Sequence, residues 1–244
     1  MGLFDIFGGG TGPEKALKLK AKATQKYGDP TTRQKALEQL AAMDIPEAVT
    51  ALMGRFTLSV DPATTDEDEK DSVFQLIVGR GKDAVAPVTQ FLLSSDSASS
   101  WALRILEEIA KDGSLDLIGV VIGVLEKVGA GYARDPEKKL VMLNFLEGKD
   151  DPRVVPAVLP FLDDTADDVK IAAARVLAPK KDERFREPLL NALTGDESSK
   201  RVQTALVTAL FETGFGVQGY REKVEAIAKD PYFVDKSGVL KKRG

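Results

Sequence analysis

The stretch DDVKIAAARVLA, from Asp167 to Ala178, decides the fold. At 100° per residue its apolar side chains fall within about 140° of one another, so the stretch predicts an amphipathic helix with one buried face. Small residues at the middle of that face allow a neighbouring helix to approach closely. The members of the face are Val169, Ala172, Ala173, Val176 and Leu177.

The same pattern recurs along the chain and alternates with a second kind of helix. SKRVQTALVTAL, from Ser199 to Leu210, repeats the apolar offsets, and Thr32–Ala41 and Ser99–Ala110 are looser copies. The second kind begins at Asp and carries Pro early, where the first helical N–H groups lack intrahelical partners anyway. Deeper prolines are expected to bend their helices. The Pro-bearing stretches are 83–92, 151–162 and 182–193, with 45–56 as a shorter version, and the deeper prolines are Pro156, Pro160 and Pro188.

Helical periodicity continues over most of the chain, and no segment has convincing strand alternation. A unit of roughly 31–38 residues with two antiparallel helices is typical of an α-solenoid, in which stacking supplies the core. We predict an all-α fold of about six stacked helix pairs. The expected helices are 13–27, 30–43, 45–57, 67–80, 83–94, 98–111, 114–128, 135–147, 151–162, 166–178, 182–194, 198–212 and 219–229.

The D-x-V-K-x-A-A-x-x-V-L core at Asp167–Leu177 resembles the second helix of a HEAT repeat, and 151–162 resembles the first helix. The resemblance is good for 83–111 and 151–212 and weaker elsewhere. It implies an α-α superhelix whose second helices line the concave side, and a family of mostly protein-binding scaffolds with a few enzymes. Armadillo units remain an alternative, whereas the aromatic pattern of tetratricopeptide units is not found.

The expected organisation has three parts: a flexible apolar N-terminal segment (1–12), a single solenoid domain (13–230) and a C-terminal tail (231–244). The stretch Leu115–Leu125 is too short to cross a bilayer. Residues 1–10 lack the features of a secretory signal. We therefore predict a cytoplasmic protein, or one peripheral to a membrane.

Two absences narrow the chemistry, because the 244 residues include no His and no Cys. Thiolate nucleophiles, Cys-ligated zinc, imidazole bases and His metal ligands are excluded. The formal net charge of −4 argues against nucleic acid as the main partner. We predict no cofactor, no metal site and no catalytic residues.

The proposed binding surface is the concave groove, lined by side chains that point away from the apolar stripe of the second helices. Arg and Thr side chains there are suited to receive a peptide segment of a partner protein. The sequence does not identify that partner. The groove candidates are Arg104, Glu108, Lys138, Arg175, Arg201, Thr204 and Thr208.

The N-terminal segment is a second candidate surface. It places four large apolar residues before Gly8-Gly9-Gly10, and a lysine row follows on the first helix. The face opposite the lysine row holds Ala16, Leu19, Ala23 and Tyr27. One interpretation is a cap, in which the apolar tip packs onto the first repeat and the lysines are solvated. The other is an anchor for a membrane surface or an acidic partner. The residues concerned are Leu3, Phe4, Ile6, Phe7, Lys15, Lys18, Lys22 and Lys26.

Three further features have mainly structural explanations. The acidic run Asp61–Asp71 departs from EF-hand spacing and suits a helix start capped by Thr65 or Asp66. Gly119 and Gly123 predict close helix packing. Trp101, the only Trp, is expected in the core.

The sequence thus favours a non-enzymatic HEAT-repeat scaffold that binds a partner protein through its concave surface. The alternatives are a HEAT-like enzyme of the DNA glycosylase or chromophore lyase type, and a membrane adaptor anchored by the N-terminal segment. An enzyme would need carboxylates with perturbed pKa values converging in the groove.

Overall fold

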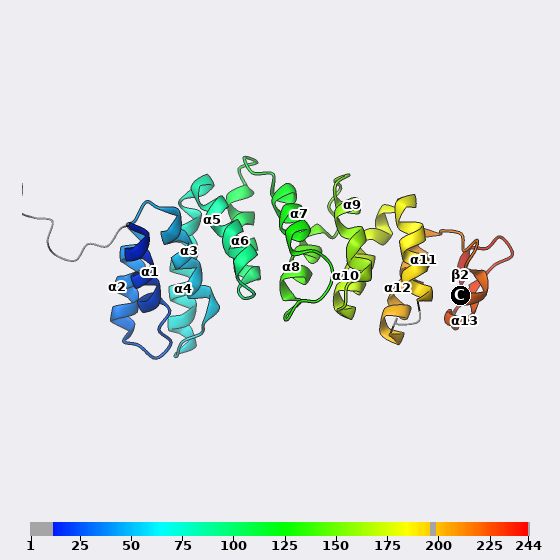
Figure 1. The fold of residues 1–244 in the computed structure, drawn as a ribbon, viewed down its shortest axis with the longest axis horizontal. Helices are drawn as coiled ribbons and strands as arrows, with labels where there is room; N and C mark the ends of the chain where they lie inside the picture. Colours follow the sequence, from blue (N-terminus) through cyan, green and yellow to red (C-terminus); the bar gives the residue numbers. More distant parts are fainter. Residues whose placement is uncertain (1–11, 196–198, 244) are drawn as a thin grey trace, which may run out of the picture. The chain divides into compact units, whose positions relative to one another are not determined.

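The computed structural model describes residues 12–195 and 199–243, and its helices follow the predicted order (Figure 1). By its internal contacts the chain divides into two units, Met1–Val120 and Val121–Gly244. The single uninterrupted solenoid domain stays a prediction. The helices of the first unit are α1 (Gly12–Ala23), α2 (Pro30–Ala41), α3 (Pro46–Met53), η1 (Gly54–Thr57), α4 (Ala63–Val78), η2 (Gly81–Ala84), α5 (Val85–Ser94) and α6 (Ser99–Ala110).

Helix α7 (Leu117–Val128) runs across the boundary between the units, and the second unit adds helices and a short hairpin. Its elements are α8 (Glu137–Leu146), α9 (Val154–Val158), η3 (Leu159–Asp163), α10 (Asp167–Leu177), η4 (Ala178–Lys180), η5 (Glu183–Phe185), α11 (Arg186–Thr194), α12 (Lys200–Thr213), α13 (Arg221–Ile227), β1 (Tyr232–Val234) and β2 (Leu240–Lys242).

Within each unit the helices form pairs, and the pairs stack. In the first unit α1 packs on α2 and α5 on α6, while α1, α3 and α5 form one layer and α2, α4 and α6 the other. In the second unit α10 contacts α8 and α12, and α11 packs on α12. The cores are fully buried apolar side chains, such as Leu52 and Ile77 in the first unit and Leu177 and Leu206 in the second. The predicted all-α fold of stacked helix pairs is confirmed.

The helix type changes at Pro160, the proline farthest from the start of its predicted helix. The predicted helix 151–162 is α-helical only to Val158 and continues as the 3₁₀ helix η3. Pro160 lies at the start of η3, where its missing N–H and fixed φ are tolerated. The expected bend is therefore a switch from α to 3₁₀ geometry.

Two ends of the chain differ from the prediction. Helix α1 ends at Ala23, four residues early, so Tyr27 is 91% exposed and is not part of the buried face. At the other end, Tyr232–Val234 pairs antiparallel with Leu240–Lys242. Because these strands have only three residues each, they contain too little alternation to reveal a strand in the sequence.

The close packing expected at Gly123 is not found. A Cβ built at Gly123 would meet no described heavy atom within 4 Å. The residue lies within α7, where glycine is less favourable than alanine by roughly 0.5–1 kcal/mol. Gly123→Ala should therefore raise the free energy of unfolding by about that amount in urea denaturation.

The matched control for this prediction is Gly148→Ala. Gly148 has equally open surroundings but a φ of 73°, which strains any residue with a Cβ. The same substitution should destabilise the protein there. Loss of stability in Gly123→Ala would mean that the glycine is packed against a neighbour after all.

Candidate functional site: an apolar groove on α1, α3 and α5

The first unit carries an open groove across the N-terminal halves of three neighbouring helices. Each of α1, α3 and α5 has a proline in its first turn and an alanine close to it, so few side chains rise from the floor. The resulting cleft has a volume of about 670 Å³. Its apolar lining is made by Pro13, Ala16, Leu17, Pro46, Ala51, Ala86 and Pro87.

Leu17 gives this groove its apolar character. The buried stripe of α1 is Ala16, Leu19 and Ala23, which face the other helices. Leu17 lies to one side of that stripe and is 68% exposed. A leucine that is two-thirds exposed and borders a cleft provides apolar surface that a ligand can cover.

The rim of the groove is polar and carries both signs of charge. Lys20 contributes a cation from α1, and Glu47 and Asp83 contribute carboxylates from α3 and η2. Thr50 and Gln90 complete the rim. This arrangement can bind an apolar segment in the centre and polar groups at its edges.

This groove lies on the first helices of the pairs, whereas the residue pattern favoured a binding surface on the second helices. The only signal was Leu17, an apolar residue off the buried stripe of its own helix. The hollow itself depends on alanines from three helices far apart in the sequence.

The predicted lysine row is exposed on the opposite flank of α1. Lys15, Lys18, Lys22 and Lys26 are all exposed. At 100° per residue Lys15, Lys18 and Lys22 lie on one side of the buried stripe and Leu17 lies on the other, whereas Lys26 follows the end of the helix at Ala23. The row therefore does not line the groove. Leu3, Phe4, Ile6 and Phe7 fall outside the described residues.

Two residues of the first unit were predicted to line the concave groove, Arg104 and Glu108. Both lie on α6 and neither lines the apolar groove on α1, α3 and α5. The guanidinium of Arg104 covers the ring of Trp101, with 4.4 Å from its carbon to the ring centroid. Trp101 is half-buried rather than fully buried, and it stacks on Phe56 with ring centroids 4.7 Å apart. Glu108 forms an ion pair with Lys111 on its own helix, at 2.7 Å. These side chains therefore have local partners.

The candidates of the second unit join neighbouring second helices to one another. Arg175 on α10 pairs with Glu147 at the end of α8, at 2.9 Å. Arg201 on α12 pairs with Asp168 on α10, at 2.8 Å. Exposed pairs of this kind contribute little stability, about 0–1 kcal/mol each.

The remaining three candidates do not form an open polar surface. Lys138 is only 7% exposed, contrary to the prediction that it lines a groove. The hydroxyls of Thr204 and Thr208 donate to backbone carbonyls of their own helix, at 2.8 and 3.1 Å. Such bonds within a helix satisfy the hydroxyl groups without a ligand.

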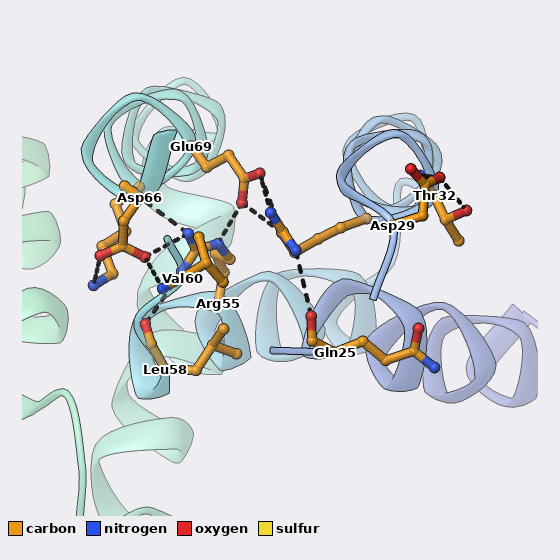
Figure 2. A network of polar contacts seen from close by, with 10 residues as sticks. Gln25, Asp29, Thr32, Arg55, Leu58, Val60, Asp66 and Glu69 are labelled. Atoms are coloured by element: carbon orange, nitrogen blue, oxygen red, sulfur yellow. Dashed lines mark hydrogen bonds and ion pairs between the residues drawn. The ribbon is translucent and has the colours of Figure 1, made fainter. Parts of the chain in front are cut away.

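A buried polar network in the first unit has Glu69 at its centre (Figure 2). Arg33 donates two hydrogen bonds to the Glu69 carboxylate, each at 2.8 Å, and Arg55 donates a third at 2.8 Å. Arg33 is 2% exposed and Arg55 is 0% exposed. Because α2, η1 and α4 each supply one of these residues, the network joins three elements of the first unit.

Asp66 extends the network at the beginning of α4. Its carboxylate accepts from Arg55 Nη2 at 2.7 Å, from Lys70 Nζ at 2.6 Å and from the Val60 N–H at 3.0 Å. The predicted capping role is wrong, because α4 begins at Ala63 and has no side-chain cap. Two acids of this run, Asp66 and Glu69, therefore pair with buried arginines.

The electrostatics of the network keep both carboxylates ionised. Burial acts to raise the pKa of Asp66, but the hydrogen bonds from Lys70 and Arg55 outweigh it and lower the pKa to about 2. At Glu69 burial also acts to raise the pKa of the carboxyl group, but the hydrogen bonds from Arg33 and Arg55 outweigh it. The pKa of Glu69 therefore lies below its usual range. A general acid or base needs a pKa near the working pH. The network therefore has a structural role, in which it holds α2, η1 and α4 together.

The second unit contains a comparable buried ion pair. Lys139 Nζ lies 2.6 Å from Asp164 Oδ2, with side chains 2% and 1% exposed. Asp164 also accepts from the N–H groups of Gly131 and Ala166, at 3.0 and 2.9 Å. Both members are therefore satisfied by the fold. Among residues 12–195 and 199–243 no group of three or more acidic side chains is placed to hold a metal ion.

Comparisons with known proteins give little beyond the fold. No protein-family model matches the chain, and no curated protein matches it. Among solved structures, the chain is similar to human deoxyhypusine hydroxylase in complex with glycerol. The two are 16% identical over 90% of this chain and 91% of the other, with a TM-score of 0.37.

This likeness corrects one part of the sequence analysis. The neighbour is an enzyme, so the prediction of a non-enzymatic scaffold that uses its concave surface is contradicted, and we do not retain it. At this identity and TM-score the activity of the hydroxylase is not transferred to this chain.

No helix in the described part of the chain is long and apolar enough to cross a membrane.

Proposed function

We propose that the groove on α1, α3 and α5 binds an apolar segment of another polypeptide. The observation that carries the proposal is Leu17, 68% exposed at the edge of a cleft of about 670 Å³. Clefts that bind ligands commonly have volumes of about 300–1,000 Å³ and mostly apolar linings. The proposal concerns binding alone and is independent of any catalytic activity of the chain.

The chemistry of the groove favours a short segment with two or three large apolar side chains at helical spacing. Such segments place one apolar face in a groove and keep polar residues at the rim. Lys20 on one side and Glu47 and Asp83 on the others can fix the direction of the segment through opposite charges. Because a contact of this size is small, we expect a dissociation constant in the micromolar range, about 1–100 μM.

We also infer that the stacked helix pairs are HEAT repeats. The support is the residue pattern of Asp167–Leu177, which forms α10 with Val169, Ala172 and Ala173 all buried. In repeats of this kind each pair contacts its neighbours, and extended surfaces are used for binding.

The test is selection from a displayed library of random 12-residue peptides on the full chain. We expect enriched peptides that contain at least two large apolar residues at i, i+3 or i+4 spacing. Ala86→Arg places a long charged side chain over an exposed floor position and should weaken their binding by about tenfold or more. Fluorescence anisotropy of a labelled selected peptide gives the affinity.

Ala21→Arg is the matched control, because Ala21 is also an exposed alanine within a helix of the first unit but does not line the groove. It adds the same charge and should leave the affinity unchanged. Equal effects of the two substitutions, or peptides that bind independently of both, would contradict the proposed function.

A second candidate function is weak contact with an anionic membrane surface. It is supported by the exposed lysines Lys15, Lys18 and Lys22 of α1, with Lys26 exposed just beyond the end of the helix. Basic residues near an anionic surface contribute about 1 kcal/mol each. The apolar residues that precede the helix would add buried area.

This candidate predicts that the protein floats with vesicles containing phosphatidylserine. Lys18→Glu with Lys22→Glu should lower the floating fraction several-fold, since four charge units are removed from the contact. Lys35→Glu with Lys82→Glu, two exposed lysines outside the row, is the control. If the protein does not float with the vesicles, or if both variants lower the floating fraction equally, this second candidate function is contradicted.

A further inference from the structure

We propose that residues 2–7 of this same chain are an intramolecular ligand of the groove on α1, α3 and α5. This inference rests on the proposed function, since it names an occupant of the same site and a means of regulating it. The segment Gly2-Leu3-Phe4-Asp5-Ile6-Phe7 lies outside the described residues, and its sequence and the described groove carry the argument.

The first argument is the place where the chain enters the fold. Helix α1 begins at Gly12, and the next residue, Pro13, already lines the groove. All three helices line the groove from their first turns onward, so the preceding segment starts at its edge. The four residues 8–11, which precede the helix, can span up to about 14 Å when extended. That reach covers one to two helix spacings of about 8–10 Å each.

The second argument is the match between segment and groove. The segment has the chemistry expected of a ligand, with apolar side chains at positions 3, 4, 6 and 7. Leu3, Ile6 and Phe7 recur at i, i+3 and i+4, the spacing that would place them on one face if the segment bound as a helix. Leu17 and the alanine floor offer the apolar surface that such a face would cover.

The third argument concerns the linker and charge. Gly8-Gly9-Gly10 has no Cβ atoms and can adopt the positive φ angles that a reversal of the chain requires. Asp5 carries the charge opposite to that of Lys20 on the rim and the same sign as Glu47 and Asp83, so we expect Asp5 to lie at the Lys20 side of the groove. A tethered segment of this kind has an effective concentration in the millimolar range. It therefore competes with an external peptide for the groove.

The absence of cysteine from the chain allows a direct test by disulfide trapping. Asp5→Cys is combined with Thr50→Cys, at the rim of the groove, and the full-length protein is oxidised at low concentration. We expect an intramolecular disulfide, detected by electrophoretic mobility and intact mass. The control pairs Asp5→Cys with Lys15→Cys, which lies on the opposite flank of α1 but within reach of the same tether.

The inference predicts at least fivefold faster closure for positions 5 and 50 than for positions 5 and 15. Equal rates would mean random encounter and would overturn it. A disulfide between two molecules would identify a second copy of the chain as the occupant, which also overturns the intramolecular assignment.

A second measurement separates failure of this inference from failure of the proposed function. The affinity of a library-selected peptide is compared between the full chain and the variant Phe4→Ser with Phe7→Ser. With an effective concentration near 1 mM and a segment dissociation constant of about 0.1 mM, removal of the competitor should raise the affinity about tenfold. Unchanged affinity, with binding still lost in Ala86→Arg, overturns the inference and leaves the proposed function intact. Rapid closure of positions 5 and 50 without any groove-dependent peptide supports the inference and overturns the proposed function.

Discussion

Glu69→Ala should lower the free energy of unfolding of the first unit by about 3–5 kcal/mol, because it leaves two buried arginines without their shared carboxylate. Arg33 and Arg55 are at most 2% exposed, and Glu69 accepts hydrogen bonds from both. A loss of this size corresponds to a decrease in melting temperature of roughly 10–20 °C for a unit of this length. Thermal unfolding followed by circular dichroism measures it.

Glu67→Ala is the control for this prediction. Glu67 lies on the same helix and is exposed, so its replacement should change the stability by less than about 0.5 kcal/mol. If the two variants unfold at the same temperature, the network contributes nothing to the stability of the first unit.

Asp164→Ala should destabilise the second unit by a similar amount, about 3–5 kcal/mol. The substitution leaves the ammonium of Lys139 buried at 2% exposure without its 2.6 Å partner. It also removes the acceptor of two backbone N–H groups, at Gly131 and Ala166. Urea unfolding at neutral pH measures the loss.

A double variant separates the buried charge from the lost hydrogen bonds. Lys139→Met removes the stranded ammonium, so adding it to Asp164→Ala should restore part of the stability. A double variant as unstable as the sum of the single variants would show that the ion pair itself is unimportant.

The sequence predicts the helices well where a single face is apolar. Asp167–Leu177 is predicted as 166–178 and forms α10, and Lys200–Thr213 is predicted as 198–212 and forms α12. In both helices small and branched apolar residues recur at helical spacing and are buried. Periodicity is sufficient there because burial of one face determines both the helix and its packing.

The polar network could not be predicted in the same way. Arg33 and Glu69 are 36 positions apart, and each is an ordinary charged residue in a helical pattern. Their burial depends on how α2 and α4 are placed by the apolar core. A pattern within one helix contains no information about a partner on another.

The groove escaped prediction for a related reason. Its floor needs alanine and proline from α1, α3 and α5 at matching depth, although each of these residues is unremarkable in its own helix. The sequence analysis looked for charged and hydroxyl side chains on second helices, and most of these are occupied by ion pairs or backbone carbonyls. Leu17 was visible in the sequence as an apolar residue off its stripe and is the signal that was overlooked.

Binding in the groove is tested most directly by hydrogen–deuterium exchange of the full chain with and without a saturating library-selected peptide. We predict slower exchange in the N-terminal halves of α1, α3 and α5, over residues 13–20, 46–51 and 83–90, and little change in α6. Protection confined to the second helices α2, α4 and α6, or no protection anywhere in the first unit, would contradict the assignment of this groove as the binding site.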